Sequence, residues 1–177
     1  QHEWSGGFAY VPRERRSEGL ILQQSVTENT TLPHLDKLKR WAFFANRARE
    51  RELTGELAGR VRLKSASLET PVWKLSGGNQ QKVVFARAVA ARPRVLLLEE
   101  PTRGVDVGAK YDIYLLLREL AAAGVAIVMS SSDTAELIGM TDRIAVMREG
   151  RIITIVSSHG LTQQRLTTLC FGLHENK

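Results

Sequence analysis

Four consecutive aliphatic residues, Val95 to Leu98, lead directly into two glutamates, Glu99 and Glu100. An apolar run of this length is typical of a strand buried in a sheet. Carboxylates that follow such a strand lie at its carboxyl end, and open α/β sheets bind their ligands at that edge. One carboxylate there can hold Mg²⁺ while its neighbour polarises a water molecule. The alternative is a strand that simply enters an acidic turn.

The segments around this strand alternate between extended and helical patterns. Between 110 and 123, for example, Ile113, Leu116, Leu117 and Leu120 share one helical face. Apolar strands that alternate with amphipathic helices predict an α/β fold with a parallel, doubly wound sheet. The predicted strands are 7–11, 95–98, 125–129, 143–147 and 152–156, and the predicted helices are 79–91, 110–123, 134–138 and 161–171.

The residues before position 75 are more charged and only weakly periodic. Ser25 and Glu28 have the spacing of a capping box, which predicts a brief helix that ends before Pro33. A second helix is expected over 46–57, with Glu50, Arg51, Glu52 and Glu56 on its polar face. We therefore expect a small helical subdomain at about 14–74, a core at about 75–160, and a C-terminal helix and tail at about 161–177.

Composition narrows the class of protein. The 177 residues are 43% hydrophobic, which is enough for a core, and no apolar run approaches the roughly 18 to 20 residues of a membrane span. The N-terminus lacks the pattern of a signal peptide. The one cysteine, Cys170, excludes an internal disulfide and is expected to be a small core residue.

The net charge is +6, with arginines clustered at 13–16 and 47–51. Two solvated faces are one interpretation of these clusters. Contact with an acidic protein surface, anionic lipid or nucleic acid is the other.

Ser76, Gly77 and Gly78 precede a predicted helix. Glycines let the backbone approach an anion closely, serine offers a hydroxyl donor, and the N–H groups at a helix start favour phosphate. A simple turn before a helix is the alternative, because Ser-Gly-Gly is common in loops.

Together, LSGGNQQK and LLLEEPTRGVD resemble the signature motif, Walker B strand and D-loop of ATP-binding-cassette (ABC) ATPases. The residues at 79–82, 103–110 and 7–12 are similar to those of bacterial sugar importers. In that family one polypeptide holds two ATPase halves, and the chain resembles the second half. The resemblance implies a P-loop NTPase-like parallel sheet core with a small helical subdomain, lacking the N-terminal Walker A portion.

The resemblance also implies a site shared by two nucleotide-binding units. Residues of the signature would contact a nucleotide held by the other half, Asp106 would lie at the seam between halves, and Glu99 would lie near Mg²⁺. Glu100 would position or activate water, and Ser132 occupies the switch position. The signature residues concerned are Ser76, Gly77, Gly78 and Gln80.

The chain departs from the general family pattern in one missing motif and at three positions. The chain contains no Gly-x-x-x-x-Gly-Lys-Ser/Thr phosphate loop, so the main cradle for the β- and γ-phosphates is not present in it. Glu99 replaces the usual aspartate, and Arg13 stands where a glutamine or an acid is expected beside the metal. Ser132 replaces the usual histidine, as it does in second halves of the sugar importers.

The implied function is ATP hydrolysis coupled to uptake of a sugar or similar small solute, with ATP and Mg²⁺ as cofactors. The implied partners are the other nucleotide-binding half, transmembrane permease subunits docking on about 13–70 and, indirectly, a periplasmic solute-binding protein. The implied location is the cytoplasmic face of the bacterial inner membrane, and no nucleic acid is expected.

Two alternatives remain open. One is a soluble ABC protein acting on nucleic acid or the ribosome. The basic charge favours this alternative, and the importer-like sequence at 103–110 disfavours it. The other is a regulatory ABC domain that does not hydrolyse ATP.

Overall fold

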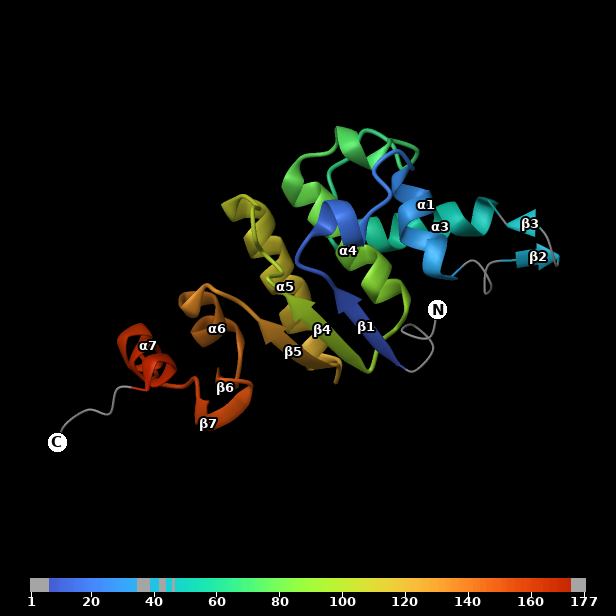
Figure 1. The fold of residues 1–177 in the computed structure, drawn as a ribbon. Coiled ribbons are helices and arrows are strands. Elements are labelled where there is room, and N and C mark those ends of the chain that lie inside the picture. The colour runs from blue at the N-terminus through green and yellow to red at the C-terminus, as the bar shows by residue number, and fades with distance from the viewer. Residues whose placement is uncertain (1–6, 35–38, 42–43, 46, 173–177) are drawn as a thin grey trace. The chain divides into compact units, whose positions relative to one another are not determined.

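The computed structural model describes residues 7–34, 39–41, 44–45 and 47–172. The chain divides into two compact units, Gln1–Met129 and Ser130–Lys177 (Figure 1). Among the described residues, no helix has both the length and the apolar character of a membrane span. The expectations for the extreme N-terminus, for position 46 and for the tail after 172 fall outside the described residues.

The first unit contains a three-stranded sheet in the order β1-β4-β5, formed by Phe8–Val11, Val95–Glu99 and Ala126–Ser130 (Figure 1). Strands β1 and β4 are parallel, with Tyr10 opposite Leu97. The prediction of a parallel α/β core is confirmed for this pair. Glu99 ends β4, so the carboxylate pair lies at the carboxyl end of a strand, as expected.

The two faces of this sheet differ in burial. Ala9, Val11, Leu96 and Leu98 are at most 3% exposed. On the other face, Tyr10 and Leu97 are each 37% exposed, Phe8 is 50% exposed, and Val128 of β5 is 59% exposed. The apolar run at 95–98 was interpreted as a strand buried in a sheet, and this interpretation is wrong for one face, because Leu97 is exposed there. The apolar strand β5 likewise has an exposed face, at Val128.

Two long helices follow the predicted pattern closely. Helix α4 spans Gly77–Ala90 and contains three consecutive core residues, Val83, Val84 and Phe85. Helix α5 spans Val107–Ala122, and its predicted apolar face is confirmed, since Ile113, Leu116, Leu117 and Leu120 are at most 3% exposed. Helix α4 contacts both β1 and α5, so these elements share one core.

The remaining elements of this unit are the helix α3 (Arg47–Arg60) and several short segments. The short segments are η1 (Arg15–Gly19), α1 (Val26–Thr31), η2 (Leu32–His34), β2 (Lys39–Trp41), β3 (Phe44–Ala45) and η3 (Val72–Lys74). The capping box of Ser25 and Glu28 is confirmed. The antiparallel pair β2–β3 was not predicted.

Helix α3 confirms the expected helix but not its polar face. Glu50 is only 5% exposed, so placing it among the solvated residues is wrong. The side chain of Arg51, by contrast, is exposed and pairs with Glu69 at 2.9 Å. The proposed boundaries of a helical subdomain at 14–74 remain a prediction.

The second unit contains α6 (Thr134–Met140), β6 (Arg143–Arg148), β7 (Arg151–Ser157) and α7 (Gln163–Phe171). The predicted hairpin is confirmed: β6 and β7 are antiparallel, and Glu149 and Gly150 both have positive φ, as a tight hairpin turn requires. Ile144, Val146 and Leu166 form a small core. Cys170 is exposed, so its prediction as a core residue is wrong.

Candidate functional site

Ser76 caps the N-terminus of α4 and is exposed to solvent. Its hydroxyl oxygen accepts hydrogen bonds from the backbone N–H of Asn79 at 3.4 Å and from the Asn79 side-chain amide at 3.0 Å. These bonds occupy the acceptor positions of the oxygen, whereas the hydroxyl proton is able to point outward. The exposed helix start therefore presents a donor and a positive dipole end to solvent.

Gly78 is required by the close approach of the next helix. A Cβ at this position would lie 2.5 Å from the Cβ of Ala109 and 2.8 Å from Oδ2 of Asp106. The backbone of α4 at Gly78 therefore packs against the side chains of Ala109 and Asp106 in the first turn of α5. From the sequence, this glycine was expected only to admit an anion, and the structure adds a packing reason.

Gly77 faces a guanidinium group. A Cβ here would lie 2.8 Å from NH2 of Arg15 and 3.3 Å from the carbonyl oxygen of Gly104. The same guanidinium donates hydrogen bonds to the carbonyls of Arg103 at 2.9 Å and Gly104 at 3.2 Å. Burial, together with the charge of Arg16, lowers the pKa of Arg15 from its ordinary value.

Gln80 is 1% exposed. Its amide nitrogen donates to the carbonyls of Val72 and Leu75, both at 3.2 Å, and its oxygen accepts from Nε of Arg16 at 3.3 Å. The structure therefore gives Gln80 a supporting place, because its side chain holds the turn that precedes Ser76. A contact of Gln80 with nucleotide remains a prediction.

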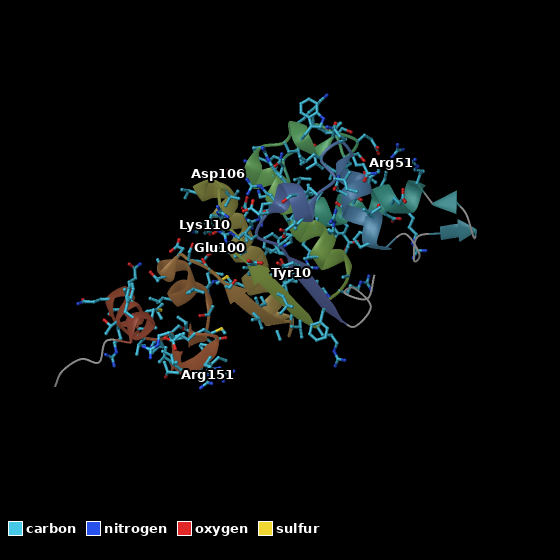
Figure 2. All side chains as sticks on the ribbon, viewed as in Figure 1. Tyr10, Arg51, Glu100, Asp106, Lys110 and Arg151 are labelled. Carbon is cyan, nitrogen blue, oxygen red and sulfur yellow. The ribbon has the colours of Figure 1, made fainter. Side chains whose placement is uncertain are left out.

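Asp106 is exposed and caps α5, accepting a hydrogen bond from the backbone N–H of Ala109 at 2.9 Å. Figure 2 shows Asp106 and Lys110 on the first turns of this helix. Because α4 and α5 meet at Gly78, their two exposed caps, Ser76 and Asp106, belong to neighbouring helix N-termini. The structure thus groups the predicted signature and D-loop residues.

The two glutamates at the end of β4 have different surroundings. Glu99 accepts a hydrogen bond from the Tyr10 hydroxyl at 2.6 Å. Glu100, labelled in Figure 2, has a φ of +46°. This left-handed backbone conformation costs a residue that carries a side chain about 1–2 kcal/mol. Next to it, the Pro101 carbonyl accepts a hydrogen bond from the Gln81 amide at 2.8 Å, so helix α4 holds the turn that carries Glu100.

Ser132 lies in the second unit, in the loop between β5 and α6, and is exposed. In the same loop Ser131 donates a hydrogen bond to the buried carboxylate of Glu136, and Asp133 caps α6. The structure groups Ser76, Gly77, Gly78 and Asp106 at the starts of α4 and α5. Glu99 and Glu100 lie at the end of β4, and Ser132 belongs to the other unit.

Among the described residues, no group of three or more histidine, cysteine or acidic side chains has the arrangement of a metal site. Mg²⁺ at nucleotide sites needs only one or two carboxylates beside the phosphates. Glu99 therefore suits Mg²⁺ as a single ligand, with Tyr10 fixing one of its oxygens. Arg13 is exposed and lies 3.9 Å from Glu14.

The contacts of the segment 14–16 were not foreseen from the sequence. Its arginines were expected to form either a solvated face or a partner surface, whereas Arg15 and Arg16 reach the D-loop and Gln80. The partly buried ion pair between Lys82 and Asp112, at 2.7 Å, was missed as well. The spacing of these residues gives no periodic signal, because their partners are 30 to 89 positions away.

The comparisons with known proteins agree with this arrangement. Residues 1–103 match the family model described as ABC transporter. An ATP-binding cassette solved as a dimer in a post-hydrolysis state with ADP and phosphate matches with a TM-score of 0.72 and 26% identity, over 87% of this chain and 64% of that one. The chain therefore belongs to the ABC transporter ATP-binding family.

The chain is also similar to curated proteins of sugar import. A ribose import ATP-binding protein of Rubrobacter xylanophilus is 48% identical over 167 residues, which are 94% of this chain and 32% of that protein. A xylose import ATP-binding protein of Geobacillus kaustophilus is 45% identical over 166 residues, 94% of this chain and 33% of that protein. The chain spans about a third of the length of these relatives.

Proposed function

We propose that this chain forms the signature side of a composite ATP site in an ABC importer that couples ATP hydrolysis to uptake of a sugar or similar small solute. The names of the ribose and xylose import relatives support the class of solute. The observation that carries the proposal is the pair of exposed helix caps, Ser76 and Asp106, on helix N-termini that touch at Gly78.

In this proposal Ser76 donates its hydroxyl proton to the γ-phosphate of an ATP held by another nucleotide-binding half. The first N–H groups of α4, at Gly77 and Gly78, add to the positive end of the helix dipole. The donors are fixed in advance by the cap, so little reorganisation accompanies binding. Asp106 contacts the same seam from α5.

The carboxylates act on a second nucleotide, bound to a phosphate loop in the same half as this chain. Glu99, oriented by Tyr10, would hold Mg²⁺, which when bound neutralises charge on the phosphate oxygens. Glu100 would orient the attacking water from the turn that α4 supports. Ser132 would supply a hydrogen bond to the γ-phosphate, without the charge of a histidine.

The proposed partners are the other nucleotide-binding half and the permease subunits, with a periplasmic solute-binding protein acting through the permease. The proposed location is the cytoplasmic face of the bacterial inner membrane. The dimer of the matched cassette structure supports a second half as partner.

The test is Ser76→Arg in a longer importer protein that carries this chain, assembled with its permease in proteoliposomes. We expect ATP turnover and solute uptake to fall by about 100-fold or more, because the larger cation fills the space of the γ-phosphate. Ala122→Arg is the matched control, since it places the same side chain at the exposed C-terminal end of α5. Unchanged uptake in Ser76→Arg would refute the composite site.

A second test uses the chain by itself. Because it has no phosphate-loop motif, we expect no steady-state ATP turnover above background. Turnover that Glu100→Gln abolishes would contradict this expectation.

A further inference from the structure

Three consecutive side chains, Glu14, Arg15 and Arg16, contact the two motifs of the proposed site. Glu14 pairs with Arg103 at 2.7 Å, Arg15 reaches two carbonyls of the D-loop, and Arg16 reaches Gln80. We call residues 14–16 the clamp. The sequence pattern gave them no role in the site.

Arg15 is the centre of the clamp. Its guanidinium spans the carbonyls of Arg103 and Gly104, at 2.9 and 3.2 Å, while its NH2 group occupies the space in which Gly77 has no side chain. A planar fork with several fixed donors can bridge two consecutive carbonyls, whereas a lysine ammonium cannot span both in one geometry. The guanidinium therefore lies against both the first turn of α4 and the D-loop.

The guanidinium is held there despite an unfavourable surrounding. Its Nε is buried and meets no acceptor among the described residues, and a buried unsatisfied donor is destabilising. A merely solvated arginine would turn this group to water. The position of Arg15 is thus fixed by the two carbonyls and by the glycine beside it.

Arg16 extends the same link to the turn before Ser76. It contacts the oxygen of Gln80, whose nitrogen holds the carbonyls of Val72 and Leu75. The clamp thus touches the D-loop directly and the Ser76 turn through one buried amide.

We propose that Arg15 is a positioning residue that sets the spacing between the signature turn at Gly77 and the D-loop at Arg103–Gly104. The positions of Ser76 and Asp106 relative to each other are thereby fixed when a nucleotide binds. This inference rests on the proposed function of the signature. Arg15 acts through these loops and does not itself touch nucleotide.

The experiment uses Arg15→Lys and Arg15→Gln in the importer protein that carries this chain, assembled with its permease. We expect kcat for ATP hydrolysis to fall about tenfold, with the dissociation constant for ADP unchanged, because ADP lacks the phosphate that Ser76 contacts. The melting temperature is expected to change by less than about 3 °C. Arg92→Lys, an exposed arginine beyond the other end of α4, is the matched control and keeps its kcat.

A double-mutant comparison separates positioning from general loss of structure. In a Ser76→Ala background, Arg15→Lys is expected to lower kcat less than about twofold further, since its effect passes through Ser76. A full loss of about tenfold in that background would overturn the proposal, as would a loss that disappears when kcat is normalised to folded protein.

The failure of this inference is distinguishable from failure of the proposed function. If Ser76→Arg abolishes turnover while both Arg15 variants keep the parent kcat, the clamp has no positioning role and the composite site stands. If Ser76→Arg has no effect, the composite site fails and the clamp fails with it.

Discussion

Helices α4 and α5 meet twice, and the two meetings are built differently. At their N-termini the backbone of Gly78 in α4 lies against the side chains of Ala109 and Asp106, and the capping residues Ser76 and Asp106 are exposed. One turn further along, Lys82 of α4 and Asp112 of α5 form an ion pair at 2.7 Å, with the lysine side chain 5% exposed. At the first contact the polar groups of Ser76 and Asp106 are exposed and able to bind a ligand. At the second, the charges of Lys82 and Asp112 pair with each other within the protein.

The second contact is a small polar network. Lys82 also donates to the carbonyl of Arg62 at 2.9 Å, and Arg62 pairs with the other oxygen of Asp112 at 3.2 Å. Each charge in it has a partner, which is the condition under which buried charges are tolerated. Changes at the first contact are therefore expected to act on activity, and changes at the second on stability.

The largest effect is expected from Gly78→Ala. The new methyl would lie 2.5 Å from the Cβ of Ala109, so the first turns of α4 and α5 must separate. We expect ATP turnover of the assembled importer to fall by about 100-fold or more. Gly59→Ala in α3 is the control and should keep full activity, since nothing lies within 4 Å of the place its new methyl group would take. Equal activity of the two variants would remove the distinction between the two contacts.

Lys82→Met should show the reverse pattern. It leaves Asp112 partly buried beside a single exposed arginine, and removal of one partner of a partly buried pair is expected to destabilise by about 1–3 kcal/mol. We expect urea unfolding to show this loss, with kcat per folded molecule unchanged. Arg60→Met removes an exposed ion pair with Glu119 and should destabilise by less than about 1 kcal/mol. A loss of kcat without a loss of stability in Lys82→Met would contradict the assignment.

The smallest effect concerns pH. Burial tends to raise the pKa of the Asp112 carboxyl, but hydrogen bonds and charges from Lys82 and Arg62 outweigh it and hold that pKa below its ordinary value. The folded state therefore binds the proton less tightly than the unfolded state, so the stabilisation is present above about pH 4 and is lost as pH falls through the folded pKa.

Urea unfolding of the parent and of Asp112→Asn at several pH values between 6 and 3 measures this effect. The difference in unfolding free energy between the two proteins should be constant above about pH 5 and shrink below about pH 4. A difference that stays the same down to pH 3 would show that the charge of Asp112 contributes nothing to folding.

Much of the fold followed from periodicity. The apolar face of α5 and the hairpin at Glu149–Gly150 were predictable because each depends on residues near in sequence. The burial of β4 and β5 was not, because Leu97 and Val128 have the apolar character of core residues, and only the folded chain shows which sheet face is covered.

The candidate site was predictable as a set of motifs but not as a geometry. Order and spacing indicated Ser76, Glu99, Glu100 and Asp106. The structure alone shows that Gly77 and Gly78 are packed against Arg15 and α5, and that Gln80 is buried. These contacts join residues that are distant in sequence. The pattern of a single sequence, read by itself, carries no signal for them.

The most direct test is covalent labelling of residue 76 by a bound nucleotide analogue. Ser76→Cys, in a Cys170→Ser background because Cys170 is exposed, is treated with an ATP analogue that carries a thiol-reactive group on its γ-phosphate. We expect labelling of position 76 in the assembled importer, and we expect it to vanish when the phosphate-loop lysine of the other half is replaced by alanine. Labelling that persists without that lysine, or that requires only a loop in the same half, would contradict a signature acting across the boundary.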